Sequence, residues 1–200
     1  MKFFPFIIIF LLLLGFSSCE EPFYLPKPRA YPKIDFPKGD KEKFVDRYGC
    51  PFSFVIPEYA VSEQDTTYFG EKPESTCWFN LHVKNLNSTI HCTYKKINNV
   101  KELNQLINDS YTFANKHNVK ADFIDDYFIR KPNRVYCRIL EIQGDVASPF
   151  QFFVTDSLNH FMRGSLYFNA RPNQDSLAPA IEFMKKDIID MINSFEWDKR

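Results

Sequence analysis

Asp156, Ser157 and His160, three residues of one short segment, carry the groups that nucleophilic catalysis needs. A serine hydrolase combines a hydroxyl, an imidazole and a carboxylate that converge from separate elements beside an oxyanion donor. Here all three lie in one expected turn, and no Gly-x-Ser-x-Gly signature surrounds the serine. Asp and Ser side chains in turns commonly bond their own backbone. We therefore interpret the segment as a capped turn, and the sequence predicts no catalytic residue.

Two histidines, His82 and His91, flank a short link between two runs of alternating apolar residues. If these runs pair as a hairpin, His82 faces Thr89 and His91 faces Asn80. The imidazoles are then diagonal neighbours on one face, within reach of a single metal ion. Zinc sites in proteins use three or four protein ligands, and no third ligand is in view. The two histidines are weak metal candidates, and we predict no metal and no other cofactor.

Four of the five cysteines, Cys50, Cys77, Cys92 and Cys137, follow the N-terminal segment and allow three disulfide pairings. The same hairpin register offsets Cys77 from Cys92 by two positions, which exceeds the Cα separation of about 5.5–6 Å that a disulfide needs. We therefore expect Cys77 to bond Cys50, just before the first predicted strand. Cys92 and Cys137 are interpreted as buried thiols, and a Cys92–Cys137 bond is the alternative.

The fifth cysteine, Cys19, follows an almost purely apolar run at residues 3–16 and two serines. That run is shorter than the ~20 apolar residues of a membrane-spanning helix and has the proportions of a signal peptide. It is typical of a bacterial lipoprotein signal, in which the Cys thiol receives a diacylglycerol. We predict that residues 1–18 are removed and that Cys19 is the lipid attachment site. A signal peptide cut elsewhere, leaving the Cys19 thiol free, is the alternative.

The segment after Cys19 is rich in proline. Proline removes backbone donors and favours extended geometry, so residues 19–40 are expected to form a stiff tether between the lipid and a folded domain. Its second half is more apolar than a solvated spacer needs, with Tyr31, Ile34 and Phe36. We expect these side chains to pack either on the chain's own domain or on a partner protein.

The composition excludes one class of partner. The formal net charge is 0 at pH 7, so the chain lacks the basic surface that nucleic-acid binding requires. Only 6 of its 200 residues are Gly, which disfavours the loops that wrap phosphate groups. We therefore predict no nucleic-acid partner.

Residues 41–200 are predicted to form a single α+β domain. Alternating apolar residues predict strands at 52–56, 77–83, 89–95, 123–130, 135–142, 150–155 and 161–168, and helical spacing predicts helices at 100–117 and from Asp175-Ser176 onward. Asn99 and Asp175-Ser176 are the expected helix caps. Short links favour a mainly antiparallel sheet of about six to seven strands, packed with two main helices on one or both faces. This element order is similar to that of Mog1 and PsbP domains.

Five segments in order along the chain resemble one known family: YLPKPRAYPKIDFP (24–37), CPFSFVIPEYA (50–60), CWFNLHV (77–83), DSYTFANKHNVKAD (109–122) and residues 152–197. Together they resemble the gliding-motility lipoprotein family GldD of Bacteroidota. Membership implies a non-enzymatic component of the gliding machinery and its linked type IX secretion system, with no active-site residues. The acidic pair Glu20-Glu21 also suits lipoproteins of that phylum, in which such residues influence sorting to the outer membrane.

The leading hypothesis is a lipid-anchored envelope protein that supports gliding and type IX secretion. Its expected location is the outer membrane, on either the periplasmic or the surface side. Its expected partners are the membrane, through the N-terminal lipid, and other gliding or type IX secretion lipoproteins and envelope proteins. The alternative is a small-ligand or metal-binding periplasmic lipoprotein, which the aromatic-rich sheet and the pair His82 and His91 suggest.

Overall fold

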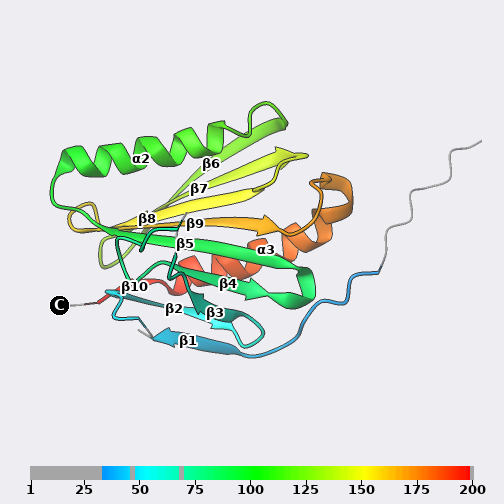
Figure 1. Cartoon of the computed structure of the whole chain (residues 1–200), viewed down its shortest axis with the longest axis horizontal. Helices are drawn as coiled ribbons and strands as arrows, with labels where there is room; N and C mark the ends of the chain where they lie inside the picture. The colour runs from blue at the N-terminus through cyan, green and yellow to red at the C-terminus, as the bar shows by residue number, and fades with distance from the viewer. Residues whose placement is uncertain (1–32, 46–47, 68–69, 199–200) are drawn as a thin grey trace, which may run out of the picture. The chain divides into compact units, whose positions relative to one another are not determined.

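Two antiparallel sheets and two long helices make up the described part of the chain (Figure 1). The structure is a computed structural model that describes residues 33–45, 48–67 and 70–198; Cys19 and Tyr31 lie outside these ranges. The elements, in chain order, are β1 (Lys41–Val45), β2 (Phe52–Pro57), β3 (Val61–Gln64), β4 (Phe79–Val83), the 3-10 turn η1 (Lys84–Leu86), β5 (Ser88–Lys96), α2 (Val100–Asn115), β6 (Ala121–Lys131), β7 (Val135–Gly144), β8 (Phe150–Thr155), β9 (His160–Phe168), α3 (Gln174–Ser194) and β10 (Glu196–Trp197).

The larger sheet has seven strands in the order β3-β4-β5-β9-β8-β7-β6, and every neighbouring pair is antiparallel. The β4–β5 hairpin has the predicted register, with His82 opposite Thr89 and Asn80 opposite His91. Between its arms, Asn87 adopts the left-handed conformation with φ of 48°, which Asn tolerates better than most residues. The predicted α+β class, with a mainly antiparallel sheet and two main helices, is confirmed.

The smaller sheet contains β2 between β1 and β10. Alternation predicts β2 correctly as a strand but does not indicate that it belongs to a second sheet. Nearly all residues of β2 are buried, because its sheet packs against the larger sheet and α3. Strands β1, β3 and β10 are not predicted by the sequence pattern. Each has only two to five residues, too few for an alternation to stand out.

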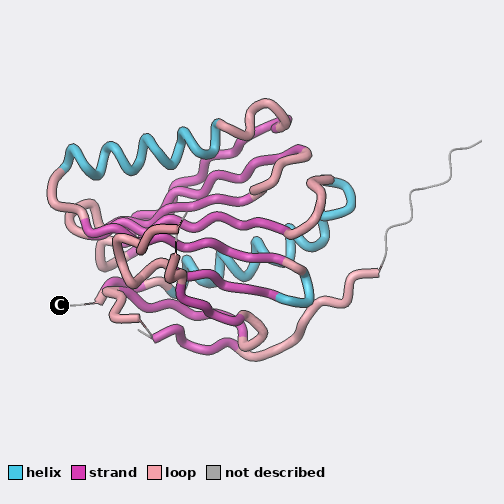
Figure 2. The backbone as a smooth tube through the Cα atoms, viewed as in Figure 1, coloured by secondary structure: helices cyan, strands magenta, loops and turns pink. Residues whose placement is uncertain are grey.

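The two helices lie on opposite faces of the larger sheet (Figures 1 and 2). We call the face toward α3 and the smaller sheet the inner face, and the face toward α2 the outer face. The inner face and its cover form one large core cluster. The outer face forms two small clusters with α2, one around Leu103, Phe153 and Phe161 and the other around Ala114 and Leu140. Both faces therefore bury apolar side chains, but to very different extents.

Helix α2 begins at the predicted cap. The Asn99 side chain accepts a hydrogen bond from the Glu102 backbone N–H at 2.9 Å, and the Glu102 carboxylate accepts one from the Asn98 backbone N–H at 3.0 Å. Such reciprocal bonding satisfies donors that the first turn leaves without intrahelical partners. Val100 is 69% exposed, so the apolar stripe that contacts the sheet begins at Leu103.

Helix α3 is capped two residues earlier than predicted. Asn173 is the cap, and its side chain accepts a hydrogen bond from the Ser176 backbone N–H at 2.9 Å. Asp175 and Ser176, the predicted opening pair, instead lie within the first turn. There Asp175 is favourably placed for the helix dipole. Asn and Ser have similar capping preferences, so the sequence alone does not separate the two positions.

Candidate functional site

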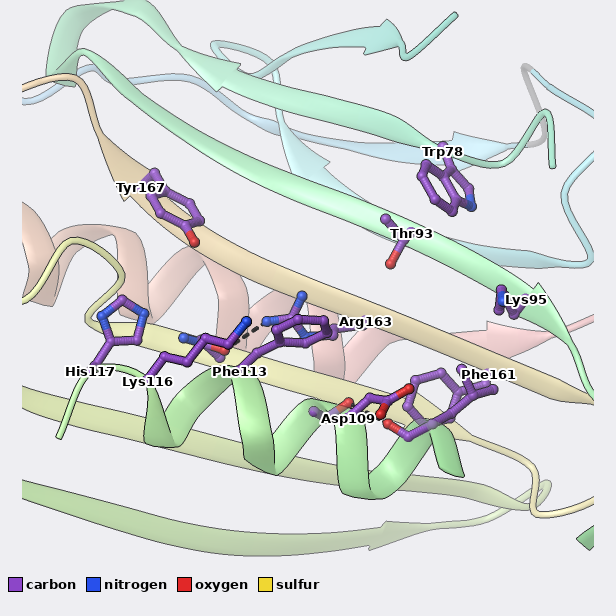
Figure 3. Close-up of a pocket in the computed structure, with 13 residues that line it drawn as sticks. Trp78, Thr93, Lys95, Asp109, Phe113, Lys116, His117, Phe161, Arg163 and Tyr167 are labelled. Carbon is purple, nitrogen blue, oxygen red and sulfur yellow. Dashed lines mark hydrogen bonds between the residues drawn. The ribbon is translucent and has the colours of Figure 1, made fainter. Parts of the chain in front are cut away.

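A groove with a volume of about 540 Å³ lies between α2 and the outer face of the larger sheet (Figure 3). Helix α2 covers only part of this face, so side chains of β5 and β9 beside it line an open channel. The groove is lined by Trp78, Thr93, Lys95, Leu106, Asp109, Ser110, Phe113, Lys116, His117, Gln151, Phe161, Arg163 and Tyr167. Aromatic and charged side chains thus share one cavity, and polar groups that converge beside aromatic walls can orient a ligand.

Two cations meet over one ring in this groove. The Arg163 guanidinium carbon lies 4.7 Å from the centre of the Phe113 ring, and the Lys116 Nζ lies 5.0 Å from the same centre. Burial, and then the nearby Arg163, lower the pKa of His117 below its ordinary value. His117 is therefore neutral at pH 7 and has one ring N–H available to donate.

Gln151 lies in strand β8 and is bonded to Arg163 of the neighbouring strand β9. Its side-chain oxygen accepts a hydrogen bond from Arg163 Nη2 at 2.8 Å. Because a guanidinium only donates, the amide must turn its oxygen toward Arg163 and its nitrogen away. Only 2% of Gln151 is exposed, yet its Nε2 has no hydrogen-bond partner in the structure. The Oγ of Ser165, directly opposite Gln151 in the sheet register, is likewise buried without a partner.

The groove is not predicted by the sequence. Its residues come from the β4–β5 hairpin and the residue before it, from α2 and the two residues after it, and from β8 and β9. Its polar members are, in sequence, ordinary polar positions of alternating or helical patterns. The one available signal is Gln151, a polar residue in the otherwise apolar run of strand β8, which is buried along its whole length. A polar side chain in such a run indicates a polar environment on one face of the strand.

The segment of Asp156, Ser157 and His160 is a capped turn, as expected. Asp156 Oδ1 accepts hydrogen bonds of 2.9 Å from three successive backbone N–H groups, those of Leu158, Asn159 and His160. Ser157 has a φ of 64° within this turn. The His160 imidazole bonds the Tyr94 hydroxyl at 2.7 Å rather than Ser157. The Asp156 and His160 side chains therefore hold the turn and its surroundings, and Ser157 takes part through its backbone N–H, which donates to Thr155 Oγ1 at 3.0 Å.

The histidines His82 and His91 lie on one face of the hairpin, as the register requires. His82 Nδ1 lies 3.0 Å from the Thr89 hydroxyl, and His91 Nδ1 lies 2.6 Å from the Asn80 side-chain oxygen. Burial, and then the neighbouring His82, lower the pKa of His91. Among residues 33–45, 48–67 and 70–198, no group of three or more His, Cys, Asp or Glu side chains is placed to hold a metal ion.

The cysteines divide as predicted. Cys50 and Cys77 form a disulfide with a Cα–Cα distance of 5.5 Å, which ties the start of β2 to the segment before β4. Cys92 and Cys137 are buried free thiols. Burial raises the pKa of Cys92, and it raises the pKa of Cys137 to about 12. Both thiols are thus protonated and unreactive at neutral pH.

A sequence profile described as "Gliding motility lipoprotein GldD" matches residues 21–197. The chain belongs to this family. Membership associates the GldD-family chain with gliding motility and makes it a lipid-anchored protein of the cell envelope. Cys50 and Cys77, the disulfide pair, fall inside two of the segments that resemble the family. Cys19 precedes the matched range.

A solved structure of another protein is similar to this chain. The solution structure of cyanobacterial PsbP (CyanoP) from Synechocystis is similar with a TM-score of 0.46 and 10% sequence identity, over 80% of this chain and 94% of that chain. No curated protein matches the chain. In the described part of the chain, neither helix combines the length and the apolar character needed to span a membrane.

The described end of the proline-rich arm contacts the folded domain. Ile34 packs against the large core cluster, and the Phe36 ring stacks on that of Phe183 in α3 with centres 4.8 Å apart. Phe36 keeps 38% of its surface exposed. Tyr31, the third residue expected to form a contact surface, lies outside the described residues.

Proposed function

We propose that this GldD-family chain is a non-enzymatic, lipid-anchored protein that supports the gliding machinery and the linked type IX secretion system. The family match over residues 21–197 carries the proposal. In this account residues 1–18 are the signal peptide, Cys19 holds the lipid in the outer membrane, and residues 19–40 form the tether. The folded domain then binds other gliding or secretion lipoproteins and envelope proteins.

The edge strand β6 supports a binding role. It is one of the two edges of the larger sheet, and at eleven residues it is longer than β3 at the opposite edge. Three of its aromatic side chains are half exposed, with Phe123 at 57%, Tyr127 at 47% and Phe128 at 55%. An unpaired edge with exposed aromatic residues can accept a strand from another chain. This edge is consistent with a protein that acts by contact.

The residues that could have suggested an enzyme have structural partners instead. Asp156 caps its own turn and His160 bonds Tyr94. The buried thiols of Cys92 and Cys137 are kept protonated by their raised pKa values. These observations favour the non-enzymatic reading over an exported hydrolase.

Deletion of the gene, followed by complementation, tests the proposal. We expect deletion to abolish colony spreading and the release of proteins with type IX secretion signals, and the wild-type gene to restore both. Cys19→Ala should fail to restore them, because the protein loses its anchor. Ser18→Ala, at the neighbouring position, is the matched control and should restore both. Unchanged spreading and secretion after deletion would contradict the proposal, as would full rescue by Cys19→Ala.

Lipid attachment itself has a direct readout. Mass spectrometry of the purified protein should show a chain that begins at Cys19 and carries acyl groups, and the lipoprotein signal-peptidase inhibitor globomycin should block this processing. Separation of the two membranes should recover the protein with the outer membrane. An unmodified, soluble product would remove the anchoring part of the proposal.

A further inference from the structure

The outer-face groove contains a buried hydrogen-bond donor that lacks an acceptor. Gln151 is 2% exposed, its oxygen is taken by Arg163 at 2.8 Å, and its Nε2 has no partner. An unsatisfied buried donor costs about 1–3 kcal/mol in a folded protein. Native structures rarely retain such groups without a reason. The missing partner must be an acceptor, and Gln151 is one of the residues that line the groove.

Charge in the groove favours an acceptor that is negative. Among the described lining residues the permanent cations are Lys95, Lys116 and Arg163, against the single carboxylate of Asp109. Lys95 also pairs with Glu74 at 2.9 Å. Lys116 and Arg163 both lie over the Phe113 ring. The chain as a whole has a formal net charge of 0. The concentration of positive charge beside Gln151 is therefore local to this groove.

The walls of the groove favour a flat apolar group. Trp78, Phe113, Phe161 and Tyr167 lie around it (Figure 3). The Trp78 indole is held in place because its Nε1 donates to the Tyr94 backbone oxygen at 3.0 Å. Aromatic rings stack on such walls at low entropic cost. A volume of about 540 Å³ lies in the range of small-molecule sites.

We propose that this groove binds a carboxylate attached to an aromatic group. Arg163 and Lys116 neutralise the carboxylate, Gln151 Nε2 donates to it, and the aromatic part lies between Phe113 and Tyr167. Arginine and a side-chain amide together suit the planar geometry of a carboxylate. A free aromatic acid and the C-terminal aromatic residue of a polypeptide both present this chemistry. The site is separate from the motility role proposed above and stands whether or not that role is correct.

Binding to the purified full-length lipoprotein in detergent tests the site. The probes are phenylacetate, the tetrapeptide Gly-Gly-Gly-Phe with a free C-terminus, and the C-terminal amides of both. We expect saturable binding of at least one acid in calorimetry, and at least tenfold weaker binding of its amide. Phenylacetate binding alone assigns a free acid as ligand, and tetrapeptide binding assigns a polypeptide end. No saturable binding of either acid, or equal binding of acid and amide, overturns the proposal.

Four variants test whether the acids bind in this groove or are attracted by positive charge anywhere on the protein. Arg163→Gln and Lys116→Gln should each weaken acid binding at least tenfold. Arg130→Gln and Lys101→Gln are the matched controls. Arg130 also lies over a ring, that of Tyr136, and Lys101 lies in the helix that Lys116 ends as its C-cap residue. Neither residue lines the groove, so both variants should bind like wild type. Acid binding that is unchanged in both groove variants would contradict the assignment.

Gln151→Glu gives the sharpest result. The substitution keeps the side-chain size and the acceptor for Arg163, but it replaces the donor Nε2 with a negative oxygen. Binding of the acids should be lost, while the thermal unfolding midpoint should not fall, since the new carboxylate pairs with Arg163. If Gln151→Glu is folded and binds the acids as well as wild type, Gln151 does not contact the ligand and the proposal fails.

Discussion

The two faces of the seven-stranded sheet bury apolar surface in different ways. The inner face is fully covered by α3 and the smaller sheet, and its core is rich in aromatic rings: Phe52 alone contacts the rings of Phe54, Phe79, Tyr94, Phe195 and Trp197 at centre distances of 5.5 to 6.3 Å. The outer face is covered only in part, by α2. There two polar side chains, Gln151 and Ser165, lie beneath an open groove, and each has a buried atom without a hydrogen-bond partner. In the inner cluster Trp197 Nε1 is likewise without a partner, but among the described residues no comparable groove lies beside it.

This difference separates stability from binding. A face that is closed and apolar contributes free energy of folding but offers nothing to a ligand. A face that keeps an open groove with polar groups in it contributes less to folding and can recognise another molecule. Substitutions on the two faces should therefore differ in size and in kind, and the following predictions test that contrast.

The largest effect is expected from Phe52→Ala on the inner side. Phe52 is fully buried, so its loss should lower the free energy of unfolding by about 3–5 kcal/mol. The outer-face counterpart Phe113→Ala removes a ring that is 42% exposed and should cost about 1 kcal/mol. Urea denaturation of both variants measures the difference. Equal losses would show that the two faces do not differ as described.

Removal of the disulfide is expected to have the next largest effect on stability. Cys50 and Cys77 are separated by 27 residues, and a loop of that length corresponds to about 3.5 kcal/mol of stabilisation in the chain-entropy description. The double variant Cys50→Ser, Cys77→Ser should unfold at correspondingly lower urea concentration. A reducing agent should destabilise the wild type and leave the double variant unchanged. Equal sensitivity of both proteins to reductant would contradict this.

Gly164→Ala probes how closely the inner face is packed. A Cβ at Gly164 would lie 2.1 Å from the nearest atom of the Phe152 ring, a distance that forces the ring to move. Overpacking of this kind costs about 1–3 kcal/mol. Gly39→Ala is the matched control, because its Cβ would meet nothing closer than 3.4 Å. Thermal unfolding should show a lower midpoint for the first variant and little change for the second.

The smallest expected effect is a pH dependence of folding stability that arises from His91 on the outer face. The pKa of His91 is lowered in the folded state by burial and then by His82. As the pH falls, the imidazole of His91 is therefore protonated in the unfolded chain before it is protonated in the folded chain. Stability contributed by neutral His91 is therefore complete above the unfolded pKa of about 6.5 and declines as the pH drops below it. His91→Gln should flatten the decline between about pH 7.5 and 5.5 in urea titrations. An unchanged slope would show that other groups cause it.

Elements with a strong local pattern were predictable from sequence. The strands with clear alternation, the cap at Asn99 and the register of the β4–β5 hairpin all follow from local residue types. That register also explains why Cys77 bonds Cys50 and leaves Cys92 as a buried thiol. Local chemistry determined these features, so one sequence was enough.

Features that depend on distant contacts were not predictable. The placement of β2 in a second sheet depends on β10, which is more than a hundred residues away in the chain. The groove depends on where α2 crosses the sheet, and no periodicity encodes that position. Its main residues, Arg163 and Gln151, are isolated polar positions in two strands, which become a site only when β8 and β9 pair.

The pairing of β10 with β2 also affects the order in which the protein folds. Trp197 lies opposite Phe52, and the Asp198 backbone N–H donates to the Pro51 oxygen at 2.9 Å. The smaller sheet is therefore complete only when segments more than a hundred residues apart in the chain have met. Until then β2 lacks its third strand and the inner core is incomplete. Pairing across so large a sequence separation carries a loop-closure cost that slows folding.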